Sequence, residues 1–323
     1  MKNKDILKQY VDTGIALPEY QVNKLKGGLL NTYLRKRIIA YTSVNGSLEI
    51  YEFNLLSDEQ KLLIINKEKR FLNDKQFEMC SDVLKKIHVI NSFEHEFTID
   101  DVMFDTCNKD VKNLFVVKSF EYKTELSDNQ FDFCDAEQKK TYIDIASNPN
   151  NNLELSDHQF DHCNDEQKEK YIINKEHLNS TTFAMCNDKL KELFINLRIK
   201  SKSPLNDVMF DKCSNKLKKR YINKIIEIGH SISMHKFNWC SDDTKKLYLD
   251  KAIDNKQDLD AYEFKYCDDN QKKLHIINVI NKQQRLSNLI FNNCDNELKK
   301  LYIDSRIKNN LYLAPYEKEY SKK

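Results

Sequence analysis

Residues 286–303 read LSNLIFNNCDNELKKLYI, and the pattern of this stretch recurs along most of the 323-residue chain. With the cysteine taken as position 0, Leu or Ile stands at −8 and Phe at −3. Asn, Asp or Ser stands at −7 and +1, Lys at +5, and an aromatic residue or His at +8. Successive cysteines are 27, 27, 29, 23, 27, 27, 27 and 27 residues apart, and such a period indicates a stack of small repeated units. The cysteines are Cys80, Cys107, Cys134, Cys163, Cys186, Cys213, Cys240, Cys267 and Cys294.

Each repeat predicts two helices. The residues at −7 and +1 are the types that accept hydrogen bonds from the first turn of a helix. The first helix is expected from −6 to about 0, with Phe and Cys on one face. The second helix is expected to begin after +1 and to bury the residues at +8 and +9. Because a two-turn helix is unstable alone, the first helix must be stabilised by neighbouring repeats.

Weaker copies of the pattern extend the array toward the N-terminus, with Leu25 and Leu56 at position 0. We therefore expect an all-α fold, a right-handed α-solenoid of about eleven 27-residue helix-turn-helix repeats in a single domain, 1–323. Residues 1–16 predict an N-terminal half-repeat cap, with Tyr10 at +8; residues 17–310 hold the repeats, and 311–323 predict a C-terminal half-repeat cap. One competing signal is Asn45-Gly46, a pair typical of β-hairpin turns.

The predicted architecture resembles that of the helical-hairpin solenoids as a class, such as tetratricopeptide, HEAT and pumilio arrays. The 27-residue period is shorter than theirs, and neither the tetratricopeptide Trp/Gly/Tyr pattern nor the ankyrin Thr-Pro-Leu-His motif occurs. The resemblance therefore implies an architecture and no residue-level function.

The composition indicates which cellular compartment and which classes of partner to expect. The net charge of +2 carries no general signature of polyanion binding. Neither a signal peptide nor a membrane span is expected, because no apolar run is long enough. Neighbouring helices lie roughly 8–10 Å apart, beyond the roughly 7 Å reach of a disulfide. One thiol per repeat therefore predicts unbridged cysteines and a reducing cytoplasm, or the host cytoplasm if the protein is viral.

The sequence contains none of the motifs of nucleotide-binding or hydrolytic enzymes. The GxxxxGK[ST], GxGxxG and GxSxG patterns are missing, and no histidine recurs beside the cysteines as a catalytic partner would. We expect no enzymatic activity, no catalytic residues and no small-molecule cofactor. His158 and His162 stand four residues apart, as metal ligands on one helix face do. No HExxH glutamate accompanies them, so we expect no metal site.

Position −1 differs from repeat to repeat, whereas the core positions barely change. A variable position on a constant scaffold is how repeat proteins select partners, and large aromatic residues are favoured anchors. Packing against an adjacent linker is the alternative interpretation of this position. The candidate partner-binding residues are Phe133, His162, Trp239 and Tyr266.

Lysine at +5 is the most constant polar position. One interpretation lays its stem along the apolar seam, with the ammonium reaching water or the carbonyls that end a first helix. The other is a column of phosphate contacts for single-stranded nucleic acid, with bases stacking on the aromatic residues. The candidate lysines are Lys85, Lys112, Lys139, Lys168, Lys191, Lys218, Lys245, Lys272 and Lys299.

The leading hypothesis is a scaffold that binds another protein along its extended surface. A single-stranded RNA-binding solenoid and a structural component of a virion are the two alternatives. The abundance of Asn, Lys and Ile is typical of an AT-rich genome, which fits a viral, phage or parasite protein that acts on host factors. The pattern leaves the oligomeric state open.

Overall fold

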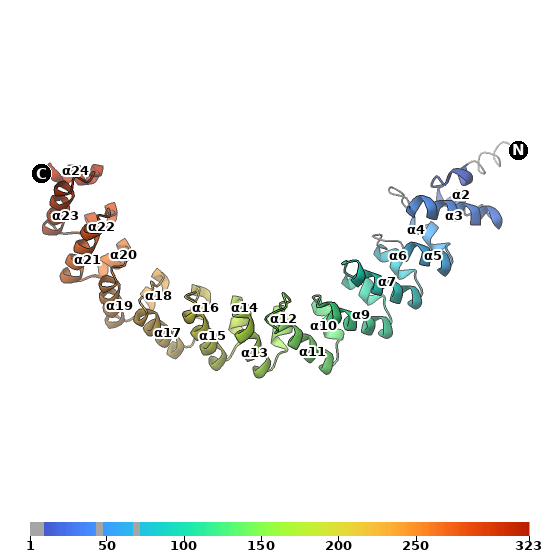
Figure 1. Ribbon diagram of the computed structural model, residues 1–323, viewed down its shortest axis with the longest axis horizontal. Helices are drawn as coiled ribbons and strands as arrows, with labels where there is room; N and C mark the ends of the chain where they lie inside the picture. Colours follow the sequence, from blue (N-terminus) through green and yellow to red (C-terminus); the bar gives the residue numbers. More distant parts are fainter. Residues whose placement is uncertain (1–9, 43–47, 67–71, 323) are drawn as a thin grey trace. The chain divides into compact units, whose positions relative to one another are not determined.

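The computed structural model describes residues 10–42, 48–66 and 72–322, and all regular secondary structure in these ranges is α-helical (Figure 1). Short and long helices alternate. The short A helices are α2 (Glu19–Val22), α4 (Ile50–Asn54), α6 (Asp74–Glu78), α8 (Asp101–Asp105), α10 (Asp128–Phe133), α12 (Asp157–Asp161), α14 (Ser180–Met185), α16 (Asp207–Asp211), α18 (Met234–Trp239), α20 (Ala261–Tyr266), α22 (Asn288–Asn292) and α24 (Pro315–Ser321). The long B helices are α3 (Gly28–Thr42), α5 (Asp58–Ile65), α7 (Asp82–Glu94), α9 (Lys109–Tyr122), α11 (Ala136–Ala146), α13 (Asp165–Lys175), α15 (Asp188–Lys200), α17 (Asn215–Glu227), α19 (Asp242–Asp254), α21 (Asp269–Asn281) and α23 (Asn296–Lys308).

The predicted helical-repeat fold is confirmed. From α2 to α23 the described helices form eleven A–B pairs in chain order, and α24 is the unpaired A helix predicted near the C-terminus. The Asn45-Gly46 turn lies outside the described residues, and α3 and α4 on either side of it are helical. Most of the predicted N-terminal cap also lies outside them. Tyr10 is exposed and Val11 is buried, so the tyrosine does not occupy the inward position predicted for it.

The chain divides into two compact units, Met1–Cys163 and Asn164–Lys323. Within the first unit, A helices α4 to α12 contact one another in order, as do B helices α3 to α11. Within the second unit, contacts join α14, α16 and α18, then α20 and α22, and the B helices run from α13 to α23 in the same manner. Each unit is thus a row of A helices beside a row of B helices (Figure 1).

The A helices are shorter than predicted. α10 ends at Phe133, and Cys134 has extended backbone angles (φ −63°, ψ 139°) that lead into the N-cap of α11. The cysteine therefore follows the helix instead of ending it. In each of the nine repeats that have a cysteine, its Sγ donates to the carbonyl four residues earlier, at 3.2 to 3.6 Å. As predicted, the nine cysteines are buried thiols rather than disulfides.

Phenylalanines at −3 form the centre of the core, and each of the nine is at most 2 % exposed. Eight of the rings lie against the residue at +8 of their own repeat, as Phe210 does with Tyr221 (centroids 5.9 Å apart) and Phe183 with Phe194 (5.6 Å). An A helix of five or six residues cannot bury such a ring by itself, so burial depends on the B helix and on the adjacent repeat.

A buried hydrogen-bond relay joins some repeats through positions +8 and −4. Tyr302 accepts from the backbone N–H of Leu286 (3.1 Å) and donates to Glu317 in the next A helix (3.0 Å). The same carboxylate accepts from the N–H of Ala314, the N-cap residue of α24, and so satisfies one free donor at the start of that helix. Tyr248 with Glu263 and Tyr33 with Glu52 repeat the arrangement. Burial raises the pKa of Tyr302 to about 12, so its hydroxyl stays protonated.

Most B helices end in the same way. The residue at +16 adopts the left-handed conformation, and the N–H at +17 bonds the carbonyl at +12, as Gln257 does with Ala252 (2.8 Å). Gly229 occupies this position in one repeat, where a Cβ would collide with the side chain of Asn255. The other residues at this position are Glu96, Lys123, Lys202, Lys256, Gln283 and Asn310.

Removing one core ring should destabilise the array. We expect Phe183→Ala to lower the free energy of unfolding by about 3–5 kcal/mol, since the fully buried ring leaves a cavity between α14 and α15. Urea denaturation measures the change. Thr181→Ala, an exposed change on the same helix, should stay within about 0.5 kcal/mol. Equal stability of the two variants would show that Phe183 is not a core residue.

Two buried histidines at +8 should make stability depend on pH. Burial lowers the pKa of His88 and of His275 to about 4, below the value of about 6.5 expected for unfolded histidine. Between these two pKa values, the histidines bind protons in the unfolded chain but not in the folded one. Stability should be full above about pH 6.5 and fall as the pH drops toward 4, by at most about 3 kcal/mol per histidine.

Urea denaturation of the His88→Phe/His275→Phe variant between about pH 7.5 and 5 tests this expectation. Phenylalanine already stands at +8 in two repeats, as Phe115 and Phe194, so the rings should fit. The variant should show a shallower loss of stability than the unchanged protein. An identical slope in both proteins would contradict the assignment.

Candidate partner-binding surface

The exposed side of the A helices is formed by positions −5, −2 and −1, because −4 and −3 face the core. Phe237 at −3 and Lys236 at −4 are buried, whereas Trp239 at −1 is 37 % exposed. Tyr266 at −1 of the next repeat is 46 % exposed. His162 is exposed and Phe133 is half-buried, so all four predicted partner-binding residues reach the surface.

Aromatic side chains at −1 stand edge-on against the core phenylalanine of the preceding repeat. Trp239 meets Phe210 with ring centroids 5.5 Å apart and planes at 87°, and Tyr266 meets Phe237 at 5.5 Å and 73°. Edge-to-face contacts are worth about 0.5–1.5 kcal/mol beyond the area that they bury. Each ring is therefore fixed on one side while its other side meets solvent. Phe133 with Phe104 and His162 with Phe131 follow the same rule in the first unit.

The second unit carries two of the predicted residues at the ends of consecutive A helices. Trp239 ends α18 and Tyr266 ends α20. Tyr262, one turn before Tyr266, lies against it (centroids 5.1 Å apart) and donates to Asn238 on α18. A hollow of about 250 Å³ adjoins Tyr266 and includes Lys245 in its lining. In the first unit, Phe133 ends α10 and His162 directly follows α12, and each likewise contacts a different core ring.

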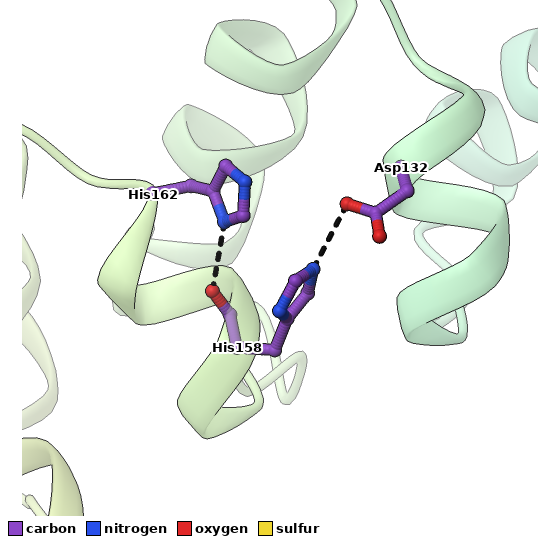
Figure 2. Close-up of side chains that lie close together, drawn as sticks. All are labelled: Asp132, His158 and His162. Atoms are coloured by element: carbon purple, nitrogen blue, oxygen red, sulfur yellow. Dashed lines mark hydrogen bonds and ion pairs between the residues drawn. The ribbon is translucent and has the colours of Figure 1, made fainter.

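Position −5 is a second variable column that the sequence analysis missed. It lies one turn before −1 on the same face, and in four repeats its side chain contacts position −2 of the preceding repeat. His158 Nε2 lies 2.9 Å from Asp132 Oδ1 (Figure 2), and His235 Nε2 lies 2.8 Å from Asp211 Oδ1. The hydrogen bond raises the pKa of His158 and lowers that of Asp132. The helical spacing between −5 and −1 was the signal that could have revealed this column.

The lysines at +5 are turned toward the protein. Lys85 Nζ lies 2.7 Å from the carbonyl of Thr106, the residue at −1 of the next repeat, and 5.5 Å from the centre of the Phe77 ring. Lys191 Nζ likewise lies 3.0 Å from the carbonyl of Lys212. The nine predicted lysines and Lys61 are buried or half-buried. These contacts agree with the interpretation in which the ammonium reaches the carbonyl end of an A helix.

Aromatic and carboxylate groups complete the surroundings of this ammonium. Lys245 Nζ lies 5.7 Å from the centre of the Phe237 ring and 4.9 Å from that of Tyr266, so the cation lies near two rings. Elsewhere the aspartate at −2 contributes, as between Lys112 and Asp105 (3.7 Å). The same pattern recurs at Lys139 with Asp132 and at Lys218 with Asp211.

The B helices of the second unit carry a separate column of exposed leucines. Leu247, Leu274 and Leu301 occupy +7 in three consecutive repeats, and each is at least 40 % exposed. The sequence analysis did not single out this position, although leucine at one exposed helical position in successive repeats is visible in the sequence. These side chains are flexible aliphatic groups, unlike the ring-supported residues on the A helices.

Cysteine chemistry is suppressed by burial. Burial raises the pKa of Cys80 to about 11 and that of Cys134 to about 12, so almost no thiolate forms at neutral pH. The neighbouring Lys61 and Lys85 lower the pKa of Cys80 only partly. The thiols thus act as small core residues.

Comparison with models of known protein families and with curated protein sequences gives no match to the chain. In the described part of the chain, none of the helices combines the length and the apolar character that crossing a membrane requires. The class of the protein, an α-helical repeat solenoid, therefore rests on its own repeats and helix contacts.

The neighbouring residues Lys85 and Lys86 allow a matched test of the inward orientation of the +5 lysines. We expect Lys85→Ala to reduce the free energy of unfolding by about 1.5–3 kcal/mol, because it removes a buried, charged hydrogen bond to Thr106. Lys86→Ala should change it by less than about 0.5 kcal/mol, since Lys86 forms only a surface pair with Asp110 (3.8 Å). Urea denaturation compares the two. A neutral Lys85→Ala would show that its contacts contribute nothing to folding.

Proposed function

We propose that the protein is a non-enzymatic scaffold that binds another protein through the exposed side of its A helices. The observation that carries the proposal is the division of roles between positions. Phenylalanine at −3 is constant and buried. The residue at −1, two positions later, varies between repeats and reaches the surface. A surface that changes from repeat to repeat on a constant core suits recognition of one particular partner.

The restricted conformations of the −1 side chains support a role in binding. Trp239 and Tyr266 are held edge-on by core rings, so they lose little conformational freedom when a partner covers them. Tryptophan and tyrosine are also the residues that dominate binding energy at protein interfaces. The adjoining hollow beside Tyr266 offers space for a partner side chain.

The orientation of the lysines favours a protein over a single-stranded nucleic acid as the partner. A phosphate contact at +5 would have to break intramolecular contacts such as that between Lys85 and Thr106. The aspartates at −2 would also repel phosphates along the same surface, as Asp132 and Asp211 illustrate. The nine buried free thiols suit a reducing compartment, which supports a cytoplasmic location as part of the proposal.

Site-specific photo-cross-linking tests the proposal. A photoreactive phenylalanine analogue replaces Tyr266 on the A-helix side or, as the control, Leu247 on the B-helix side. The two positions are matched in exposure, at 46 % and 47 %. In cells that produce the protein naturally, position 266 should yield discrete polypeptide adducts, several-fold more abundant than those at position 247.

Two outcomes contradict the proposal. Equal adducts at both positions would show that the A-helix surface is not the preferred binding surface. Nuclease-sensitive adducts at position 266 would identify nucleic acid as the partner. Circular dichroism of both modified proteins confirms beforehand that the helical fold is retained.

A further inference from the structure

Three potential metal ligands meet on the A-helix side of the first unit. Asp132 lies on α10, and His158 lies on α12 with His162 just beyond its end. One donor atom from each residue lies within 4.8 Å of the other two. Figure 2 shows both imidazole rings beside one another, facing the carboxylate across the gap between the helices.

The hydrogen bonds prepare the rings for a cation. His162 Nδ1 lies 3.0 Å from the carbonyl of His158, so in the neutral ring this nitrogen carries the proton and Nε2 has a free lone pair. Histidines that bind metal commonly donate their other ring N–H to a backbone carbonyl in this way. A metal ion would replace the shared proton between His158 Nε2 and Asp132 Oδ1, which are 2.9 Å apart.

The spacing of the three donors fits a tetrahedral ion after small side-chain rotations. Ligand atoms bound at 2.0–2.2 Å to one tetrahedral zinc lie roughly 3.3–3.5 Å apart. The Asp132–His158 contact, at 2.9 Å, must open by about half an ångström. The other separations do not exceed 4.8 Å and so must close by at most about 1.5 Å. All three side chains are exposed or half-exposed, so these rotations do not disturb the core.

We propose that Asp132, His158 and His162 form a binding site for a divalent transition-metal ion of the zinc class. Two imidazoles and one carboxylate favour zinc, cobalt or nickel over magnesium or calcium, which prefer oxygen ligands alone. Three protein ligands leave a fourth coordination position open to water or to a partner's side chain. The ion would also link two adjacent repeats, because Asp132 and the histidines belong to different ones.

The ammonium of Lys139 lies beside the proposed site, so its positive charge would oppose the binding of a metal ion. Its Nζ lies 3.6 Å from Asp132 Oδ1 and 5.0 Å from the centre of the Phe131 ring. A metal ion at Asp132 repels this ammonium, which can remain over the ring. The lysine therefore weakens the site without occupying a ligand position.

Another repeat provides a natural control. Asp211 and His235 form the same pair at 2.8 Å, and Lys218 takes the place of Lys139, 3.8 Å from Asp211. Position −1 holds Trp239 there instead of histidine. Two ligands are thus present in the second unit and the third is missing, so a single substitution can complete the set.

Cobalt(II) titration of the full chain, followed by visible absorption, tests the site. The unchanged protein should bind one ion per chain with nitrogen and oxygen ligands. His162→Trp should abolish binding, and Asp132→Asn should weaken it roughly tenfold or more. The control Asp211→Asn should leave the affinity unchanged. Trp239→His should add a second ion per chain, which the unchanged protein does not bind.

Three results would overturn the proposal. One is thiolate-to-cobalt charge-transfer absorption in the folded protein, which would assign the ion to cysteines. Another is affinity that does not change in both His162→Trp and Asp132→Asn. The third is the lack of any binding at millimolar cobalt. Circular dichroism of each variant confirms folding, so that lost binding reports the site itself.

Discussion

Burial of the phenylalanine at −3 is the constraint on which the rest of the structure depends. An A helix of five or six residues offers too little surface to shield this ring. The ring is covered by the B helix of its own repeat and, in several repeats, by the −1 side chain of the next one, as Phe237 is by Tyr248 and Tyr266. The same contact that completes the core therefore also positions the exposed face of an aromatic residue. Stability and surface recognition share one set of rings.

Polar groups reinforce this arrangement between repeats. The ammonium at +5 crosses from one repeat to a carbonyl of the next, as Lys61 does to Met79 (2.8 Å). The cap at −7 or +1 bonds an aspartate of the preceding repeat, as Ser81 does with Asp58 (2.7 Å). Each bond is modest, but all of them join neighbours along the array. Such nearest-neighbour coupling is what gives a repeat protein cooperative stability.

Positions that repeat strictly could be predicted from the sequence, and positions that depend on contacts between repeats could not. The period, the caps and the buried rings of Phe104 and Phe210 follow from local pattern. The contact between Asp132 and His158 joins residues 26 apart in different repeats, and no local rule specifies which side chains meet there. The relay of Tyr302 and Glu317 was missed for the same reason, although glutamate at −4 follows tyrosine at +8 in all three described cases.

The segment between each B helix and the next A helix takes up the differences in repeat length, and in most repeats this segment begins with the left-handed turn. In the shortest interval, α13 ends early and Glu176 makes this turn at +13. In the longest interval, the additional residues follow α11, around Asn148 to Asn151. The A helices on either side keep their usual length and their start at −6. Insertions are thus accommodated at this junction, and it is the natural place to graft a tag or a second module without disturbing the binding columns.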